Sequence, residues 1–120
     1  MGAFKQKLIQ AVNGAMKGCT DIGLNSCSVW VQGNLIVLIG EKKVMAIIDK
    51  MRKEYTSNSL QTIGLVGEIL RNEIKRSVEE KLPIHIKSVF KDFDYEHDLS
   101  LVVIMTEENI PEYLNQLTEL

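Results

Sequence analysis

The stretch from Leu70 to Met105, LRNEIKRSVEEKLPIHIKSVFKDFDYEHDLSLVVIM, decides the fold of this chain. It opens with a helical pattern, in which apolar residues recur every three or four positions among charged ones. Pro83 ends that pattern, because proline has no amide hydrogen to donate. A strand pattern follows over 84–93, then an acidic turn over 94–98 and a second strand over 99–106. The stretch therefore predicts a long helix followed by a hairpin.

The N-terminal part of the chain predicts the same order of elements. Apolar residues at helical spacing over 4–16 indicate an amphipathic helix, which Gly18 is expected to end. Residues 26–31 alternate as a strand does, and Gly33-Asn34 is typical of a tight hairpin turn. The continuous apolar run over 35–39 predicts a strand that is buried on both faces.

Two more helices complete the pattern. An apolar stripe predicts one over 44–55, and Asn109-Ile110-Pro111 opens a short one at the C-terminus. Ser57 or Ser59 is expected to cap the long helix, which runs to about Lys81. The order is thus helix, hairpin, helix, helix, hairpin, helix, in one domain over residues 1–120. We expect an α+β fold: a two-layer sandwich with a four-stranded, mostly antiparallel sheet and three or four helices on one face.

Composition limits the functions that the chain can have. It has 120 residues, 45% of them hydrophobic and 25% charged, which is ordinary for a globular domain. The formal net charge of -2 argues against binding to nucleic acid, which needs a basic surface. No targeting segment and no run long enough to cross a bilayer is visible, so a cytoplasmic protein without direct membrane insertion is expected. Cys27 shares a strand face with Val29 and Val31, which favours a core thiol over a reactive one.

The acidic turn is the first candidate site. Asp92, Asp94, Glu96, His97 and Asp98 place carboxylates and an imidazole close together, as a divalent ion would require. The calcium-loop pattern fails, however, because its sixth position needs glycine and is histidine, and its twelfth needs glutamate and is valine. Aspartates are also typical of solvated turns, where they bind their own backbone. We therefore expect no metal and no cofactor, and keep these five residues as a possible interaction site.

Trp30 is the second candidate. It alternates out of phase with Cys27, Val29 and Val31, so it lies on the opposite face of its strand, either under a helix or at a contact surface. Long apolar strands in a short chain also favour a homodimer that covers Trp30 or a sheet edge. The two histidines lie near no serine or cysteine nucleophile, so we expect no enzyme and no catalytic residues.

An RNA-binding alternative comes from the segment Ile63 to Ile69. Its sequence, IGLVGEI, resembles the I-G-x-x-G-x-x-I signature of KH domains, which clamp a nucleotide backbone between two helices. Leu65 and Val66 stand between the glycines, where KH domains usually carry a basic residue. A KH-like RNA-binding domain is therefore the second expectation for function.

Three segments resemble the MpsC family, whose members belong to a sodium-translocating, membrane-potential-generating system. The first is the hairpin SVWVQGNLIVLIG (28–40), and the second is the helix EILRNEIKRSVEEKL (68–82). The third is SVFKDFDYEHDLSLVVIM (88–105), with Asp92, Asp94 and Asp98-Leu99 in the positions of the family's acidic turn, D-x-D-x-x-x-D-L. The similarity extends from about residue 18 to 105. Leu82-Pro83 replaces the family's usual Thr-Gly.

The resemblance implies a function rather than a chemistry. Members are bacterial and cytoplasmic, and are linked to a membrane system that supplies bicarbonate and supports membrane potential. The family has no catalytic residues that can be carried over to this chain. The resemblance thus implies a non-enzymatic accessory or regulatory component that acts by contact with a protein partner.

Overall fold

The computed structural model describes residues 1–20, 23–41, 59–94 and 96–118. The elements in these ranges are α1 (Gly2–Thr20), β1 (Asn25–Gln32), β2 (Leu35–Glu41), α3 (Ser59–Lys81), β3 (Ile86–Asp94), β4 (Leu99–Thr106) and α4 (Ile110–Thr118). The helix expected over 44–55 lies outside the described residues.

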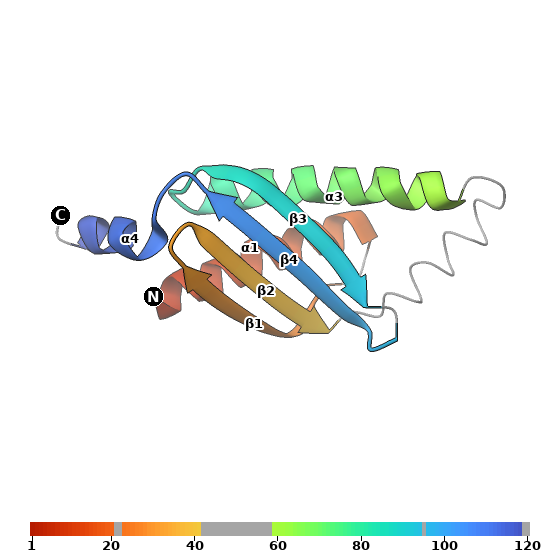
Figure 1. Ribbon diagram of the computed structural model, residues 1–120, viewed down its shortest axis with the longest axis horizontal. Coiled ribbons are helices and arrows are strands. Elements are labelled where there is room, and N and C mark those ends of the chain that lie inside the picture. Colours follow the sequence, from red (N-terminus) through yellow and green to blue (C-terminus); the bar gives the residue numbers. More distant parts are fainter. Residues whose placement is uncertain (21–22, 42–58, 95, 119–120) are drawn as a thin grey trace.

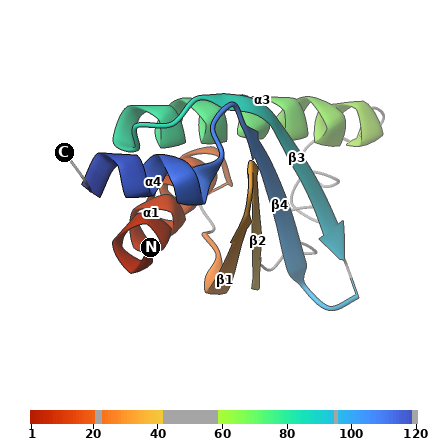
Figure 2. The same ribbon diagram turned by 60° about the vertical axis from the view of Figure 1, so that its left-hand side comes forward.

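The four strands form one antiparallel sheet in the order β1-β2-β4-β3. Each hairpin contributes one outer strand and one central strand, and β2 pairs with β4 where the two hairpins meet. Helices α1 and α3 lie side by side on one face of the sheet, and α4 lies at the end of the sheet where β4 finishes (Figures 1 and 2). The predicted α+β sandwich is confirmed, with a sheet that is wholly antiparallel.

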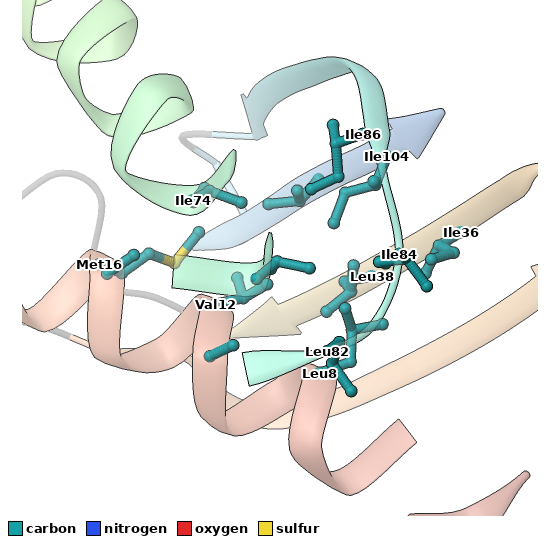
Figure 3. Packing of buried hydrophobic residues seen from close by; sticks show 14 of the residues in the cluster. Leu8, Val12, Met16, Ile36, Leu38, Ile74, Leu82, Ile84, Ile86 and Ile104 are labelled. Carbon is teal, nitrogen blue, oxygen red and sulfur yellow. The ribbon is translucent and has the colours of Figure 1, made fainter. Parts of the chain in front are cut away.

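The core lies between the two layers (Figure 3). Leu8, Val12 and Met16 of α1 are fully buried, as their helical spacing predicts, and they belong to the same core cluster as Ile36 and Leu38 of β2. The side of α3 that faces inward carries Leu70, Ile74 and Val78, each at most 2% exposed. Both amphipathic patterns are therefore confirmed for the described side chains.

The first hairpin turns where the sequence predicts it. Gly33 has a φ of 59°, a left-handed conformation that glycine adopts without steric cost. The carbonyl of Gly33 accepts the amide of Ile110 at 2.8 Å, so the same turn holds the first residue of α4. Pro111 follows in the first turn of α4, where its missing amide is not needed.

Two predicted boundaries shift. Helix α1 continues through Gly18 to Thr20, since a glycine inside a helix costs only about 1 kcal/mol and does not by itself end it. Strand β3 begins at Ile86 instead of residue 84, because the chain first makes a tight turn in which the amide of Ile84 donates to the carbonyl of Leu82 at 2.9 Å.

Within the described ranges, no helix combines the length and apolar character that crossing a membrane requires.

The prediction that β2 is buried on both faces is wrong for the structure as described. Ile36 and Leu38 face the helices and are fully buried, whereas Leu35 is 37% exposed and Val37 and Ile39 are only half-buried. An apolar run shows that both sides of a strand avoid charge, but it does not show what covers each side. The uncovered side of this sheet therefore presents apolar side chains to solvent.

Candidate functional site: the open face of the sheet

The open face is the side of the sheet turned away from α1 and α3. A row of four residues crosses its middle, one from each strand, because Trp30 pairs with Val37, Val37 with Val103, and Val103 with Phe90. Trp30 is 54% exposed and Phe90 is 55% exposed, while the two valines between them are half-buried. The row is thus an apolar strip with an exposed aromatic side chain at each end.

Two flanking rows extend this strip along the strands. On one side lie Ser28, Ile39, Leu101 and Asp92; on the other lie Gln32, Leu35, Met105 and Ser88. In both rows the central strands β2 and β4 carry the apolar side chains, and the outer strands carry the polar ones. An apolar centre inside a polar rim is the usual composition of a protein–protein interface.

Within the paired rows, the charged side chains lie at one end. Beyond the Ser28–Asp92 row, Glu41 pairs with Leu99 and Leu99 with Asp94, so Glu41, Asp92 and Asp94 form an acidic end. The opposite row, with Gln32 and Ser88 at its edges, has no charged side chain. A hollow of about 210 Å³ lies near the acidic end, lined by Ile39, Leu101 and Asp92 among others.

The acidic turn after β3 is closed by its own side chains. Asp94 Oδ1 accepts the amides of Glu96 at 3.0 Å and His97 at 3.2 Å, and Asp94 Oδ2 lies 2.9 Å from His97 Nδ1. The bond to His97, with the two amides, holds the pKa of Asp94 below its ordinary value. Asp98 follows with a φ of 51°, a left-handed conformation that aspartate tolerates. The carboxylate of Asp94 therefore organises the turn.

The described residues contain no group of three histidine, cysteine or acidic side chains that could hold a metal ion. Asp92 Oδ1 accepts the amide of Phe93 at 2.8 Å, so this carboxylate, like that of Asp94, binds neighbouring backbone. Both aspartates therefore accept hydrogen bonds from nearby backbone amides, as aspartates in solvated turns do.

A second polar cluster, which the sequence pattern does not indicate, lies at the opposite end of the sheet. Glu108 accepts the amide of His85 at 3.1 Å, and its Oε1 lies 2.5 Å from His85 Nδ1. The hydrogen bond to Glu108 raises the pKa of His85. Partial burial would raise the pKa of Glu108, but the bonds from His85 outweigh it and leave that pKa lowered. The pair fastens the start of β3 to the loop before α4.

The helix layer has a larger hollow, of about 580 Å³, between α1 and α3. Gly14 and Gly18 line one side, and Ile69 and Arg76 line the other. The guanidinium of Arg76 is already engaged, at 2.7 Å from Glu73 and 2.8 Å from Glu80, so it offers no unpaired charge to a ligand.

The structure brings some of the predicted site residues together. Trp30, Asp92 and Asp94 share the open face, whereas Glu96, His97 and Asp98 lie in the turn beyond it. Trp30 thus lies at a surface, where it is more than half exposed. Sequence reasoning missed Phe90, Leu101 and Val103, which complete the face. The alternation of Ser88, Phe90 and Asp92 against Val89 and Lys91 is the signal that could have found Phe90.

The KH-like segment does not form a loop. Residues 63–69 belong to α3, which is helical from Ser59 to Lys81. A KH clamp uses the two glycines in a turn between helices, so the backbone path here lacks the feature on which the RNA-binding alternative depends.

Comparisons with family models, with curated proteins and with solved structures find no match to the chain.

Proposed function

We propose that this protein is a non-enzymatic contact module that binds a protein partner through the open face of its sheet. The observation that carries the proposal is the central row, in which Trp30 and Phe90 are each more than half exposed beside Val37 and Val103. Contiguous apolar surface of this kind is uncommon on proteins that act alone, and it marks sites of association.

The arrangement of the face supports a binding role. Exposed tryptophan is enriched at interfaces, since one rigid side chain contributes a large contact area at a small entropic cost. Trp30 and Phe90 lie on the two outer strands, so a partner that spans the sheet contacts both of them. The β-sheet backbone holds all four residues of the row at fixed spacing, which favours a preformed surface.

The proposed cellular setting is a bacterial membrane system. It rests on the resemblance to the MpsC family in the hairpin (28–40), the helix (68–82) and the acidic turn. On that basis we place the protein in the bacterial cytoplasm, as an accessory or regulatory component of a membrane system that supplies bicarbonate or supports membrane potential.

Growth of a strain that lacks the gene tests both parts. The strain is grown in ambient air and in CO2-enriched air, and is complemented with wild type, with V103K or with I69K. Val103 lies in the centre of the open face, whereas Ile69 is 56% exposed on α3 and serves as a matched apolar control. We expect a defect in air that CO2 relieves, and that wild type and I69K correct but V103K does not.

Each part can fail separately. Equal growth under both gases would remove the bicarbonate setting. Full complementation by V103K, at a protein level equal to wild type, would remove the open face as the contact surface. Circular dichroism of purified V103K shows whether the variant is folded, because a lysine on a half-buried strand face can extend its ammonium group to solvent.

A further inference from the structure

We infer that the partner on the open face is a second copy of this chain, packed sheet to sheet with its strands running in the opposite direction. In this homodimer the two-fold axis runs along the central row, so the two central rows lie over each other and Trp30 meets Trp30 of the partner subunit. The inference rests on the proposed function, because it names the occupant of the same surface.

The area of the face fits a small dimer interface. The three rows that overlap, about 6.7 Å apart on four strands about 4.8 Å apart, give a flat area on the order of 400 Å² per copy. Two copies together bury on the order of 800 Å² as flat area, and the projecting Trp30 and Phe90 side chains add to it, so the interface lies at the lower end of the size range of specific interfaces. The face is also self-complementary in kind, since an apolar centre meets an apolar centre and a polar rim meets a polar rim.

Charge selects the direction of the second copy. A two-fold axis along the strands would bring both acidic ends together, with Glu41, Asp92 and Asp94 of each copy at the same end of the interface. A two-fold axis along the central row separates them. Asp92 then lies over the partner's uncharged Gln32–Ser88 row, and Glu41 and Asp94 lie beyond that row. Like charges across an interface are unfavourable, so the second arrangement is preferred.

The same axis pairs the flanking rows well. The row with Ser28, Ile39, Leu101 and Asp92 comes to lie over the partner's row with Gln32, Leu35, Met105 and Ser88. Its two apolar residues face two apolar residues. At the rim the Asp92 carboxylate comes to lie near a serine hydroxyl that can donate to it, and Ser28 comes to lie near a glutamine amide.

The experiment measures the mass of the full chain in solution by sedimentation equilibrium, for wild type, V103K and I69K. We expect wild type and I69K to be dimers with equal dissociation constants. V103K is expected to raise the dissociation constant by about a hundredfold, because it buries two unpaired ammonium groups near the axis. A monomeric wild type, or a V103K dimer as tight as wild type, would overturn the inference.

Charge-reversal variants test the direction. W30K alone and W30E alone are expected to be monomers, and an equimolar mixture of the two is expected to form a heterodimer, since Trp30 meets its own counterpart. The double variant W30K/F90E is expected to stay monomeric by itself. If the double variant dimerises and the mixture does not, the axis runs along the strands and the proposed arrangement is wrong. A monomeric wild type together with failed complementation by V103K would show that the face binds a different protein, which leaves the proposed function standing.

Discussion

At the scale of single residues, one buried hydroxyl joins the two helices that cover the sheet. Ser77 of α3 is 7% exposed and donates to the carbonyl of Ala11 in α1 at 2.8 Å. We expect S77A to lower the free energy of unfolding by about 1 kcal/mol, the usual contribution of such a bond. Urea denaturation measures the change.

The neighbouring exposed side chain of Lys75 provides the control for Ser77. K75A leaves the α1–α3 contact intact and is expected to change the free energy of unfolding by no more than about 0.5 kcal/mol. Equal stabilities for S77A and K75A would show that the hydroxyl contributes nothing beyond the packing of the two helices.

The His85–Glu108 pair gives the protein a pH-dependent contact. The raised pKa of His85 means that its contribution to stability is complete below the ordinary value of 6.5 and is lost as pH rises through the raised value. The lowered pKa of Glu108 means that its contribution is complete above 4.5 and is lost as pH falls through the lowered value. The pair therefore contributes most between pH 4.5 and 6.5.

The variant E108Q tests this window. Removing the carboxylate charge is expected to lower the pKa of His85 toward its ordinary value, which NMR titration of the imidazole proton measures directly. The stability difference between wild type and E108Q is expected to shrink as pH rises above the titration of His85. An unchanged His85 titration in E108Q would show that the pair does not form in solution.

At the scale of elements, substitution of two glycines by alanine is expected to change the free energy of unfolding in opposite directions. A Cβ on Gly40 of β2 would lie 3.0 Å from the Cβ of Leu24, closer than ordinary packing allows, and both residues are buried. We expect G40A to lower the free energy of unfolding by about 1–3 kcal/mol, the usual cost of overpacking. Thermal and urea denaturation measure the loss.

Gly67 of α3 is the matched position. Among the side chains that the structure describes, a Cβ there would meet the end of the flexible Arg71 side chain, at 3.6 Å. G67A is therefore expected to raise the free energy of unfolding by about 0.5–1 kcal/mol, because alanine loses less entropy in a helix. A destabilised G67A would mean that this part of α3 needs glycine for a reason other than helix formation.

Element type was predictable because each pattern reflects a local cause. The spacing of Leu8, Val12 and Met16 places them on one side of a helix, and Gly33 supplies the positive φ that the hairpin requires. Contacts between distant residues leave no such pattern. The Glu108–His85 bond spans 23 residues and the Ser77–Ala11 bond spans 66, so neither could be predicted from spacing.

At the scale of the whole molecule, the order of the strands and the uncovered face could not be predicted from the sequence. Each hairpin follows from its turn, but the pairing of Val37 with Val103 joins two hairpins that no local turn connects. The alternation of Trp30 with Val29 and Val31 assigns these residues to opposite faces of the sheet, but it does not show which face the helices cover. Sequence patterns therefore predicted Trp30 and the aspartates of the candidate site. They did not predict Phe90 of β3, or Leu101 and Val103 of β4, as part of it.

The proposed dimer makes the stability of the whole molecule depend on protein concentration. When folding and association are coupled, each tenfold rise in concentration stabilises the dimer by about 1.4 kcal/mol, so the midpoint of thermal unfolding is expected to rise by a few degrees. The V103K variant, whose association is about a hundredfold weaker, is expected to show a much smaller change in unfolding temperature across the same range, while I69K follows wild type. Calorimetry at concentrations spanning two decades, on the order of 1 to 100 times the dissociation constant, makes the comparison. A wild-type midpoint that does not change with concentration would contradict coupling between folding and dimerisation through the open face. Association of folded chains must stabilise the folded state by mass action.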